Sequence, residues 1–250
     1  EKGRYVAEEF LLSRLFMYVQ VYTHKTKRGF EILARHLFSK LLDEKIIYYP
    51  LPKKNELDEL VYYDDAWFIS TLKEIVRGKI KTNRKIKELA EMLLFRKRLK
   101  LIDEAREFVE LGREKVSRKF HKLMDLQEER MKEAFAQLAD IDPDEIFIDG
   151  PEIEITKIPY YYTSEEKEPE EVPIQILTHD GNLINIAEDP ETLIGQIARR
   201  RLKVIRLYTI DRNEEKVRRA WKKILRTNTH LEFFHNELCL LYTSDAADDG

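Results

Sequence analysis

The sequence predicts a mainly α-helical fold that ends in a small α+β region. Residues 4–43 contain no proline, which favours one long helix or two consecutive helices. Residues 84–99 and 103–138 also read as helices, the second of them long and heavily charged. β-Branched and aromatic residues separated by turn residues begin only near Asp140. We therefore expect a helical region over residues 1–139 and an α+β region over residues 140–238.

Composition narrows the class of protein before any motif is considered. The 250 residues are 43% hydrophobic and 36% charged, with only 8 Gly and 8 Pro, which is typical of a helix-rich globular chain. A net charge of −3 predicts no general attraction to nucleic acid, so a basic site would have to be local. No apolar run reaches the roughly 20 residues of a membrane span, and a single Cys cannot build a Cys-based zinc site.

The first helical segment carries the most informative residues. Residues 10–22 are almost entirely apolar or aromatic, so we expect this helix to lie in a core. Arg14, Tyr18 and Tyr22 are spaced four apart and line one face. Arg14 either pairs with a carboxylate from another helix, the usual fate of a buried charge, or reaches an anion in a pocket while the tyrosines stack on a ring.

The later elements follow from local signals. Pro50 and Pro52 interrupt the helical pattern, and Asp64 and Asp65 offer an N-cap to a short amphipathic helix. Two strand patterns flank the sequence THDGN, which reads as a β-hairpin. The expected C-terminal elements are strands 173–177 and 183–186, helix 189–199, strand 203–210 and helix 212–226.

No metal or catalytic motif emerges from the histidines. His179 and Asp180 form a His-Asp dipeptide, but Asp-Gly between two strand patterns is a turn signal, and neighbours in a strand point to opposite faces. The other histidines are scattered, and no HExxH, Walker A or GxGxxG motif is present. We expect no metal ligand and no catalytic residue in this chain.

A local basic run stands out against the net negative charge. Residues 77–100 hold ten Lys or Arg against only Glu88 and Glu91, a local charge of +8. Such a run is usually a solvated helix face, and it can also bind polyphosphate or nucleic acid. Phe95 is the only aromatic residue inside it, which is a weak platform for single strands.

Three stretches resemble a known family. They are residues 13–33 (SRLFMYVQVYTHKTKRGFEIL), 62–75 (YYDDAWFISTLKEI) and 93–104 (LLFRKRLKLIDE). The chain resembles the C-terminal part of HD-domain phosphohydrolases related to deoxynucleoside triphosphate triphosphohydrolases. The resemblance covers almost everything before Cys239, and its first stretch is the most specific. Residues 1–139 then correspond to the C-terminal part of an HD-type helical domain.

The resemblance implies two sets of binding residues. In the substrate set, Arg14 would contact the triphosphate, Tyr18 would lie beside the sugar, and Tyr22 would pack on the deoxyribose and base. Thr23, where relatives often carry Gln, completes this set. The second set would bind an activating nucleotide at a subunit interface. It comprises His24, Lys25, Arg96 and Lys100.

The resemblance also implies what lies outside the chain. The family's divalent-metal centre uses a His, a His-Asp pair and a later Asp, all upstream of the matched region. We therefore expect a cytoplasmic, homo-oligomeric parent enzyme that hydrolyses deoxynucleoside triphosphates, with this chain inactive by itself. The alternatives are a non-enzymatic helical interaction module and a nucleic-acid binder that uses the basic run.

Both ends of the chain look truncated. The start, EKGRYVAEEF, has no initiator Met and no signal-peptide pattern. The last residues, 239–250 (CLLYTSDAADDG), resemble the in-frame translation of a sequencing adapter. We expect the natural sequence to stop near Leu238.

Overall fold

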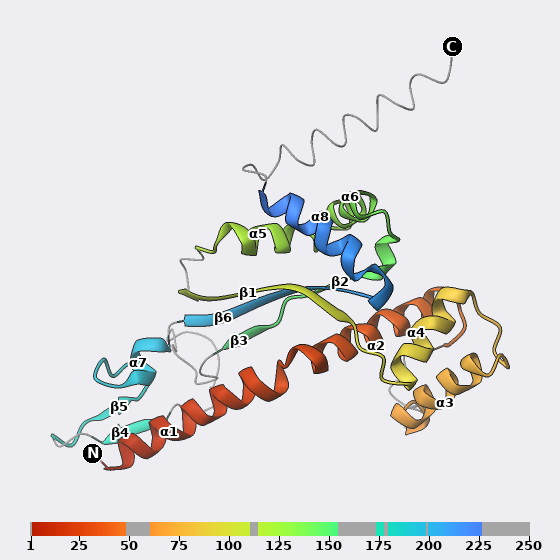
Figure 1. Ribbon diagram of the computed structural model, residues 1–250. Coiled ribbons are helices and arrows are strands. Elements are labelled where there is room, and N and C mark those ends of the chain that lie inside the picture. The colour runs from red at the N-terminus through yellow and green to blue at the C-terminus, as the bar shows by residue number, and fades with distance from the viewer. Residues whose placement is uncertain are drawn as a thin grey trace, which may run out of the picture.

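The computed structural model describes residues 2–48, 61–110, 115–154, 174–177, 180–198 and 200–226. Its centre is an antiparallel sheet of β1 (Lys100–Glu110), β6 (Arg200–Thr209) and β2 (Ile146–Asp149), in the order β1-β6-β2, with β3 (Glu152–Glu154) also paired to β6. Helices α5, α6 and α8 cover one face of this sheet, and the long α1–α2 segment runs along the other (Figure 1). The adapter-like residues 239–250 lie outside the described residues.

The N-terminal helical prediction is confirmed, with one interruption. α1 (Lys2–Met17) continues into a π-helical turn (Tyr18–Tyr22), and α2 (Lys25–Asp43) begins after a break at Thr23 and His24. The break exists because His24 adopts extended backbone angles and caps the next helix with its own side chain. Wide turns of this kind re-aim the side chains that follow, and they often mark functional sites.

The predicted N-cap at Asp64 is confirmed. Its carboxylate accepts a hydrogen bond from the Trp67 amide at 2.8 Å at the start of α3 (Asp65–Val76). Asn83 caps α4 (Arg84–Leu94) in the same way. Helices α2, α3 and α4 enclose a core of their own. Its fully buried members include Leu33, Leu37, Leu41, Leu72 and Ile86.

The helix predicted over residues 103–138 is wrong in its first part. Residues 100–110 form β1, which pairs along its whole length with β6, from Lys100 opposite Thr209 to Glu110 opposite Arg200. Glu, Lys and Arg favour a helix locally, but pairing with a strand about a hundred residues away overrides that weak preference. The prediction is confirmed for two helices in the later part, α5 (Arg118–Asp125) and α6 (Glu129–Ala139), which a turn separates.

The C-terminal elements follow the prediction closely. β4 (Gln175–Leu177) and β5 (Leu183–Asn185) form the expected hairpin, and Gly181 supplies the positive φ of its turn. α7 (Leu193–Ile197) and α8 (Glu214–Arg226) are the two expected helices, and short 3₁₀ turns occupy Pro143–Glu145 and Asp211–Asn213. His179 lies outside the described residues.

The fold class is therefore confirmed as mainly α with a C-terminal α+β part. The sheet nevertheless joins β1, from the expected helical region, to β2, β3 and β6 from the expected α+β region. The boundary near residue 140 remains a prediction. A second core lies between this sheet and α5, α6 and α8. Its members include Phe120, Leu123, Phe135, Ile205, Leu207 and Trp221.

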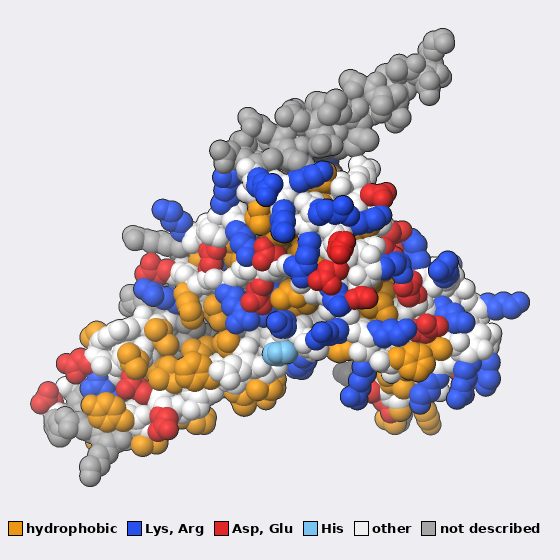
Figure 2. Space-filling view, in the orientation of Figure 1, with side chains coloured by type: hydrophobic (Ala, Val, Ile, Leu, Met, Phe, Trp, Pro, Cys, Tyr) orange, Lys and Arg blue, Asp and Glu red, His pale blue; other side chains and the backbone are white. Residues whose placement is uncertain are grey.

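The prediction that residues 10–22 lie in a core is wrong for the described part of the chain. Leu11 and Leu15 pack against α7 and β6, but Phe10, Phe16 and Val21 are 62%, 55% and 57% exposed. The reason is that the described residues cover only one side of α1. Figure 2 shows hydrophobic side chains gathered at lower left, over the part of the molecule formed by α1, α7 and the β4–β5 hairpin.

Within the described ranges, no helix combines the length and the apolar character that crossing a membrane requires.

The partly buried ring of His36 is expected to make the stability of the folded protein depend on pH. His36 lies on α2 with its ring edge-on to Phe147 at 5.2 Å, and its Nε2 is buried with no partner among the described residues. Burial lowers its pKa from the ordinary value of 6.5. The unfolded chain therefore binds this proton more readily than the folded one, so stability is full above pH 6.5 and falls as the pH drops below it.

We expect urea midpoints to decline between pH 7 and pH 5, and a His36→Leu variant to lose part of that decline. Urea unfolding of both proteins at several pH values across this range measures the difference. An identical pH slope in His36→Leu would contradict the assignment, and His121→Leu, on an exposed ring, serves as the matched control.

Candidate functional site

The π turn aligns four side chains along one side of the α1–α2 junction. The Arg14 guanidinium carbon lies 5.8 Å from the centre of the Tyr18 ring. The Tyr18 and Tyr22 ring centres are 5.1 Å apart, tilted by 49°. The Lys27 ammonium completes the row, 5.2 Å from the Tyr22 ring centre. The result is a ladder of cation, two aromatic rings and cation, each within cation–π or aromatic contact distance.

This ladder bears on the ion-pair interpretation of Arg14, while binding of an anion by Arg14 remains a prediction. Among the described residues Arg14 forms no ion pair, and its close contact is the Tyr18 ring. A structural ion pair with another helix is therefore not what holds it here. Tyr22 is 44% exposed, so a planar ligand has access to its ring. The three residues predicted to share a face do lie together.

Thr23 is placed differently from the other substrate candidates. It is buried, and its hydroxyl donates to the carbonyl oxygens of Tyr18 at 3.0 Å and Val19 at 3.2 Å. These carbonyls belong to the first two residues of the π turn, and the Tyr18 carbonyl also accepts from the Thr23 amide at 2.9 Å. The hydroxyl is thus already occupied by the backbone, and a contact from Thr23 to a base remains a prediction.

His24 and Lys25 form the start of α2. The His24 Nδ1 accepts from the Thr26 amide at 3.3 Å, so in the neutral ring the proton is on Nε2, which remains available to donate. Lys25 is exposed, while its carbonyl oxygen accepts a hydrogen bond from the Tyr208 hydroxyl at 2.9 Å. Burial raises the pKa of the Tyr208 phenol, so it stays a neutral donor that fixes the helix start to β6.

The first turn of α2 is unusually basic. Lys25, Lys27 and Arg28 all lie there, and no acidic residue does. Cations at a helix N-terminus oppose the macrodipole, so helix stability does not explain them. Arg28 pairs with Asp149, and Lys27 pairs with Glu31. Lys25 has none among the described residues, which leaves its charge free for an anion.

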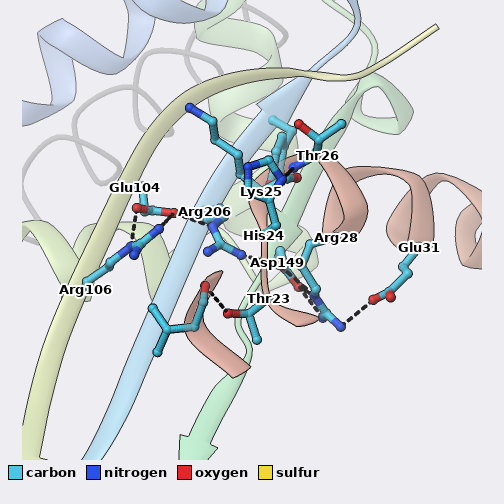
Figure 3. Close-up of polar contacts among 12 residues, drawn as sticks. Thr23, His24, Lys25, Thr26, Arg28, Glu31, Glu104, Arg106, Asp149 and Arg206 are labelled. Carbon is cyan, nitrogen blue, oxygen red and sulfur yellow. Dashed lines mark hydrogen bonds and ion pairs between the residues drawn. The ribbon is translucent and has the colours of Figure 1, made fainter. Parts of the chain in front are cut away.

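A buried ion network holds this turn to the sheet (Figure 3). Arg28 makes a two-pronged ion pair with Asp149, with its Nη2 at 2.5 Å and its Nε at 3.1 Å from the carboxylate oxygens. Arg206 Nη1 donates to the same carboxylate at 3.3 Å, and its Nε donates to Glu104, which also pairs with Arg106. Asp149 is 2% and Arg206 0% exposed.

The network sets the charge states of its members. The hydrogen bond to Asp149 raises the pKa of Arg28. Burial alone would raise the pKa of Glu104, but hydrogen bonds from Arg106 and Arg206 outweigh it and lower the pKa. The Arg206 Nη2 is buried without a partner among the described residues. The start of α2 is therefore held to β2 by the Arg28–Asp149 ion pair, and Asp149 is held in turn by Arg206 of β6.

The two remaining candidates occupy the link between α4 and β1. Arg96 is exposed and adopts φ 54°, the left-handed conformation in which a helix C-terminus usually places glycine. The Lys97 amide donates to the Met92 carbonyl at 2.8 Å and closes this C-cap. Holding a β-carbon in this region costs about 1 kcal/mol. Arg96 has no ion-pair partner among the described residues.

Arg96→Gly is expected to leave stability unchanged or raise it by up to about 1 kcal/mol, because it relieves the left-handed strain. Urea unfolding of the variant and of Arg98→Gly measures this. Arg98 lies nearby without a positive φ, so its replacement by glycine should not stabilise. A loss of more than 1 kcal/mol in Arg96→Gly would show that the Arg96 side chain itself supports the fold.

Lys100 differs from Arg96 because its charge is compensated. It lies 2.7 Å from Asp211 and 3.6 Å from Glu214. The hydrogen bond to Asp211 raises its pKa. The backbone between the two candidates approaches α2, since a β-carbon on Gly29 would lie 3.9 Å from that of Leu99. No described contact joins Arg96 or Lys100 directly to His24 or Lys25.

The basic run of residues 77–100 is only partly neutralised. Lys79 pairs with Glu74, Lys85 with Asp142, and Glu88 accepts from Arg212. Figure 2 shows acidic side chains interspersed with basic ones over the central and right-hand parts of the visible face. This face therefore does not present a continuous positively charged surface on which a nucleic acid could bind.

Sequence reasoning missed Lys27, Arg28, Asp149 and Arg206. One signal was available, because Arg206 is the only charged residue in the apolar stretch VIRLYTI, and an isolated charge in a buried strand needs a partner. Asp149 gave no such signal, because acidic residues are ordinary at strand ends.

The implied metal centre was tested against the side chains present. Across the described ranges, no three His, Cys, Asp or Glu side chains gather in a way that could hold a metal ion. The residues described here do not fit such a centre, and the position of its ligands remains a prediction.

These features define a class: a helical protein with an antiparallel sheet and a candidate anion-binding face at one helix start. The chain belongs to the HD-associated region family, whose model matches residues 1–232. Its resemblance to HD-domain phosphohydrolases is thereby confirmed at the level of the family. A search of curated proteins finds no match.

Solved structures match the fold as well. One is a phosphohydrolase from Bacteroides thetaiotaomicron, with 20% identity and a TM-score of 0.50, over 83% of this chain and 51% of that one. At this identity the likeness shows the fold. This chain spans about half the length of that phosphohydrolase.

Proposed function

We propose that these residues belong to a metal-dependent HD phosphohydrolase that hydrolyses deoxynucleoside triphosphates to deoxynucleosides and triphosphate. The observation that carries the proposal is the ladder of Arg14, Tyr18 and Tyr22. It offers a guanidinium without a carboxylate partner among the described residues, beside the partly buried ring of Tyr18 and the exposed ring of Tyr22. That combination suits a triphosphate attached to a sugar and base. Membership of the family supports the same reading.

In this proposal the chain supplies binding groups. Arg14 binds the triphosphate, and Tyr18 and Tyr22 pack on the sugar and base. His24, Lys25, Arg96 and Lys100 bind an activating nucleotide between subunits of a cytoplasmic homo-oligomer. A divalent metal held by residues outside this chain would activate the attacking water. The 250-residue chain alone is expected to show no turnover, even with added metal.

Arg14→Ala in the full-length protein is the test of the substrate site. Removing one charge-assisted phosphate contact is expected to lower kcat/KM roughly 10- to 150-fold. Chromatographic separation of deoxynucleoside from triphosphate measures the rate. Arg219→Ala, which removes an exposed arginine on α8, is the matched control and should stay within about twofold. Equal rates for both variants would contradict the assignment of Arg14.

Lys25→Ala tests the effector site separately. We expect activation by nucleoside triphosphates to be lost in this variant, and in Arg96→Ala, while diphosphates activate weakly in every protein. Activity measured against effector concentration at fixed substrate shows the change. Activation that survives in both variants, together with DNA binding that falls steeply with salt, would favour the nucleic-acid alternative.

A further inference from the structure

We propose that Lys27 is a positioning residue that fixes the Tyr22 ring for substrate, with Glu31 as its anchor. The inference rests on the proposed function, since Tyr22 is the residue that would pack on the nucleotide. Nothing in the sequence pattern assigns Lys27 a role, because it lies five positions after Tyr22 and not at helical spacing. The break between the π turn and α2 brings the two together.

The geometry defines which part of Tyr22 is left for a ligand. The Lys27 ammonium lies over the ring at 5.2 Å, and Tyr18 meets the same ring at a tilt. With 44% of Tyr22 exposed, part of its surface remains open to a ligand. A ring held in this way presents a fixed plane for stacking.

Glu31 connects this contact to the rigid interior. Its Oε1 lies 3.2 Å from the Lys27 ammonium, and its Oε2 accepts from Arg28 Nη1 at 2.7 Å. Arg28 is held in turn by the buried carboxylate of Asp149. A continuous chain of contacts therefore runs from the exposed Tyr22 ring to the sheet, through Lys27, Glu31 and Arg28 (Figure 3 shows its inner part).

Helix stability gives no reason for Lys27 to be where it is. It stands in the first turn of α2, where a cation opposes the macrodipole. Its pair with Glu31 has lysine N-terminal to glutamate, the less favourable order for an i,i+4 pair, and both side chains are substantially exposed. Replacing Lys27 should therefore leave folding almost unchanged, so a change in KM would report on Tyr22.

Lys27→Met in the full-length protein is expected to raise KM for a deoxynucleoside triphosphate about 2- to 5-fold, with kcat within twofold. Lys27→Arg keeps a cation over the ring and should restore KM. The exchange Lys27→Glu with Glu31→Lys keeps an ion pair between the two positions but removes both the cation over the ring and the Glu31 contact to Arg28, so KM should stay raised. Lys222→Met, on the exposed side of α8, is the matched control.

The possible results distinguish a failure of the role of Lys27 from a failure of the proposed function. Unchanged KM in Lys27→Met, while Arg14→Ala raises KM, overturns the role of Lys27 and leaves the proposed function standing. Full recovery of KM by the charge exchange also overturns it, because an ion pair alone would then suffice. If Arg14→Ala has no effect, the proposed function has failed, and a positioning role in that reaction fails with it.

The contact between Lys27 and the Tyr22 ring can also be measured without an activity assay. The ε-methylene protons of Lys27, observed by NMR of lysine-labelled protein, should be shifted upfield by the ring beneath them and should lose that shift in Tyr22→Leu. Tyr5→Leu, at another exposed tyrosine of α1, should leave the shift in place. The absence of an upfield shift in the unsubstituted protein overturns the inference whatever the kinetics show.

Discussion

Replacing Asp149 with alanine is expected to destabilise the fold by about 3–5 kcal/mol, the cost of removing one member of a buried charge network. Asp149 is the shared acceptor of Arg28 and Arg206, and it is 2% exposed. Without it, the ion-pair partner left among the described residues is Glu104 for Arg206 and Glu31 for Arg28. Arg206 is 0% exposed, so its guanidinium cannot reach water without breaking the packing around it.

Urea unfolding at pH 7 measures this loss. The matched control is Asp211→Ala, which removes another carboxylate from an ion pair, but one whose side chain is 80% exposed. The control should shift the midpoint far less, because exposed pairs contribute little. Equal shifts in the two variants would show that the Asp149 network does not hold α2 to the sheet.

The second large effect is expected at Trp221. Its ring is buried in the core between the sheet and α8, edge-on to Phe135 at 6.3 Å, and its indole N–H donates to Asp103 at 2.7 Å. Trp221→Ala leaves a cavity and removes one hydrogen bond from Asp103, which keeps its ion pair with Lys119, so we expect a loss of about 3–5 kcal/mol. Trp221→Phe keeps most of the packing but loses the hydrogen bond, and it should cost clearly less.

Thermal and urea unfolding monitored by far-ultraviolet circular dichroism test both variants. Trp67→Ala, at the other tryptophan, is the control, because Trp67 is only partly buried at the edge of the α2–α4 core. A loss in Trp221→Ala no greater than that in Trp67→Ala would mean that the core between the sheet and α8 contributes less than its burial indicates.

Local signals account for what sequence reasoning predicted correctly in the fold. Asp64 begins α3 because a carboxylate satisfies free amides at a helix start, and Gly181 turns the hairpin because it accepts a positive φ. Both effects act within a few residues. β1 was missed because its partner, β6, lies about a hundred residues away, and its own residues favour a helix.

In the candidate site, too, the arrangement along one helix could be predicted, whereas contacts across the break between α1 and α2 could not. Spacing along one helix placed Arg14, Tyr18 and Tyr22 on a common face, and the structure brings their side chains into contact. The role of Lys27 could not be predicted, because it depends on a π turn that helical periodicity does not reveal. The exposure of Phe10 could not be predicted either, since an apolar pattern shows what a helix can bury and not what covers it.

The most direct test of the central claim is to incubate the full-length protein containing these residues with each deoxynucleoside triphosphate and a divalent metal, and to identify the phosphorus-containing product. The account predicts inorganic triphosphate and free deoxynucleoside, at a rate that rises with added effector nucleotide and falls at least tenfold in Arg14→Ala. Release of pyrophosphate or single phosphates, or no turnover with any nucleotide and metal, would contradict it.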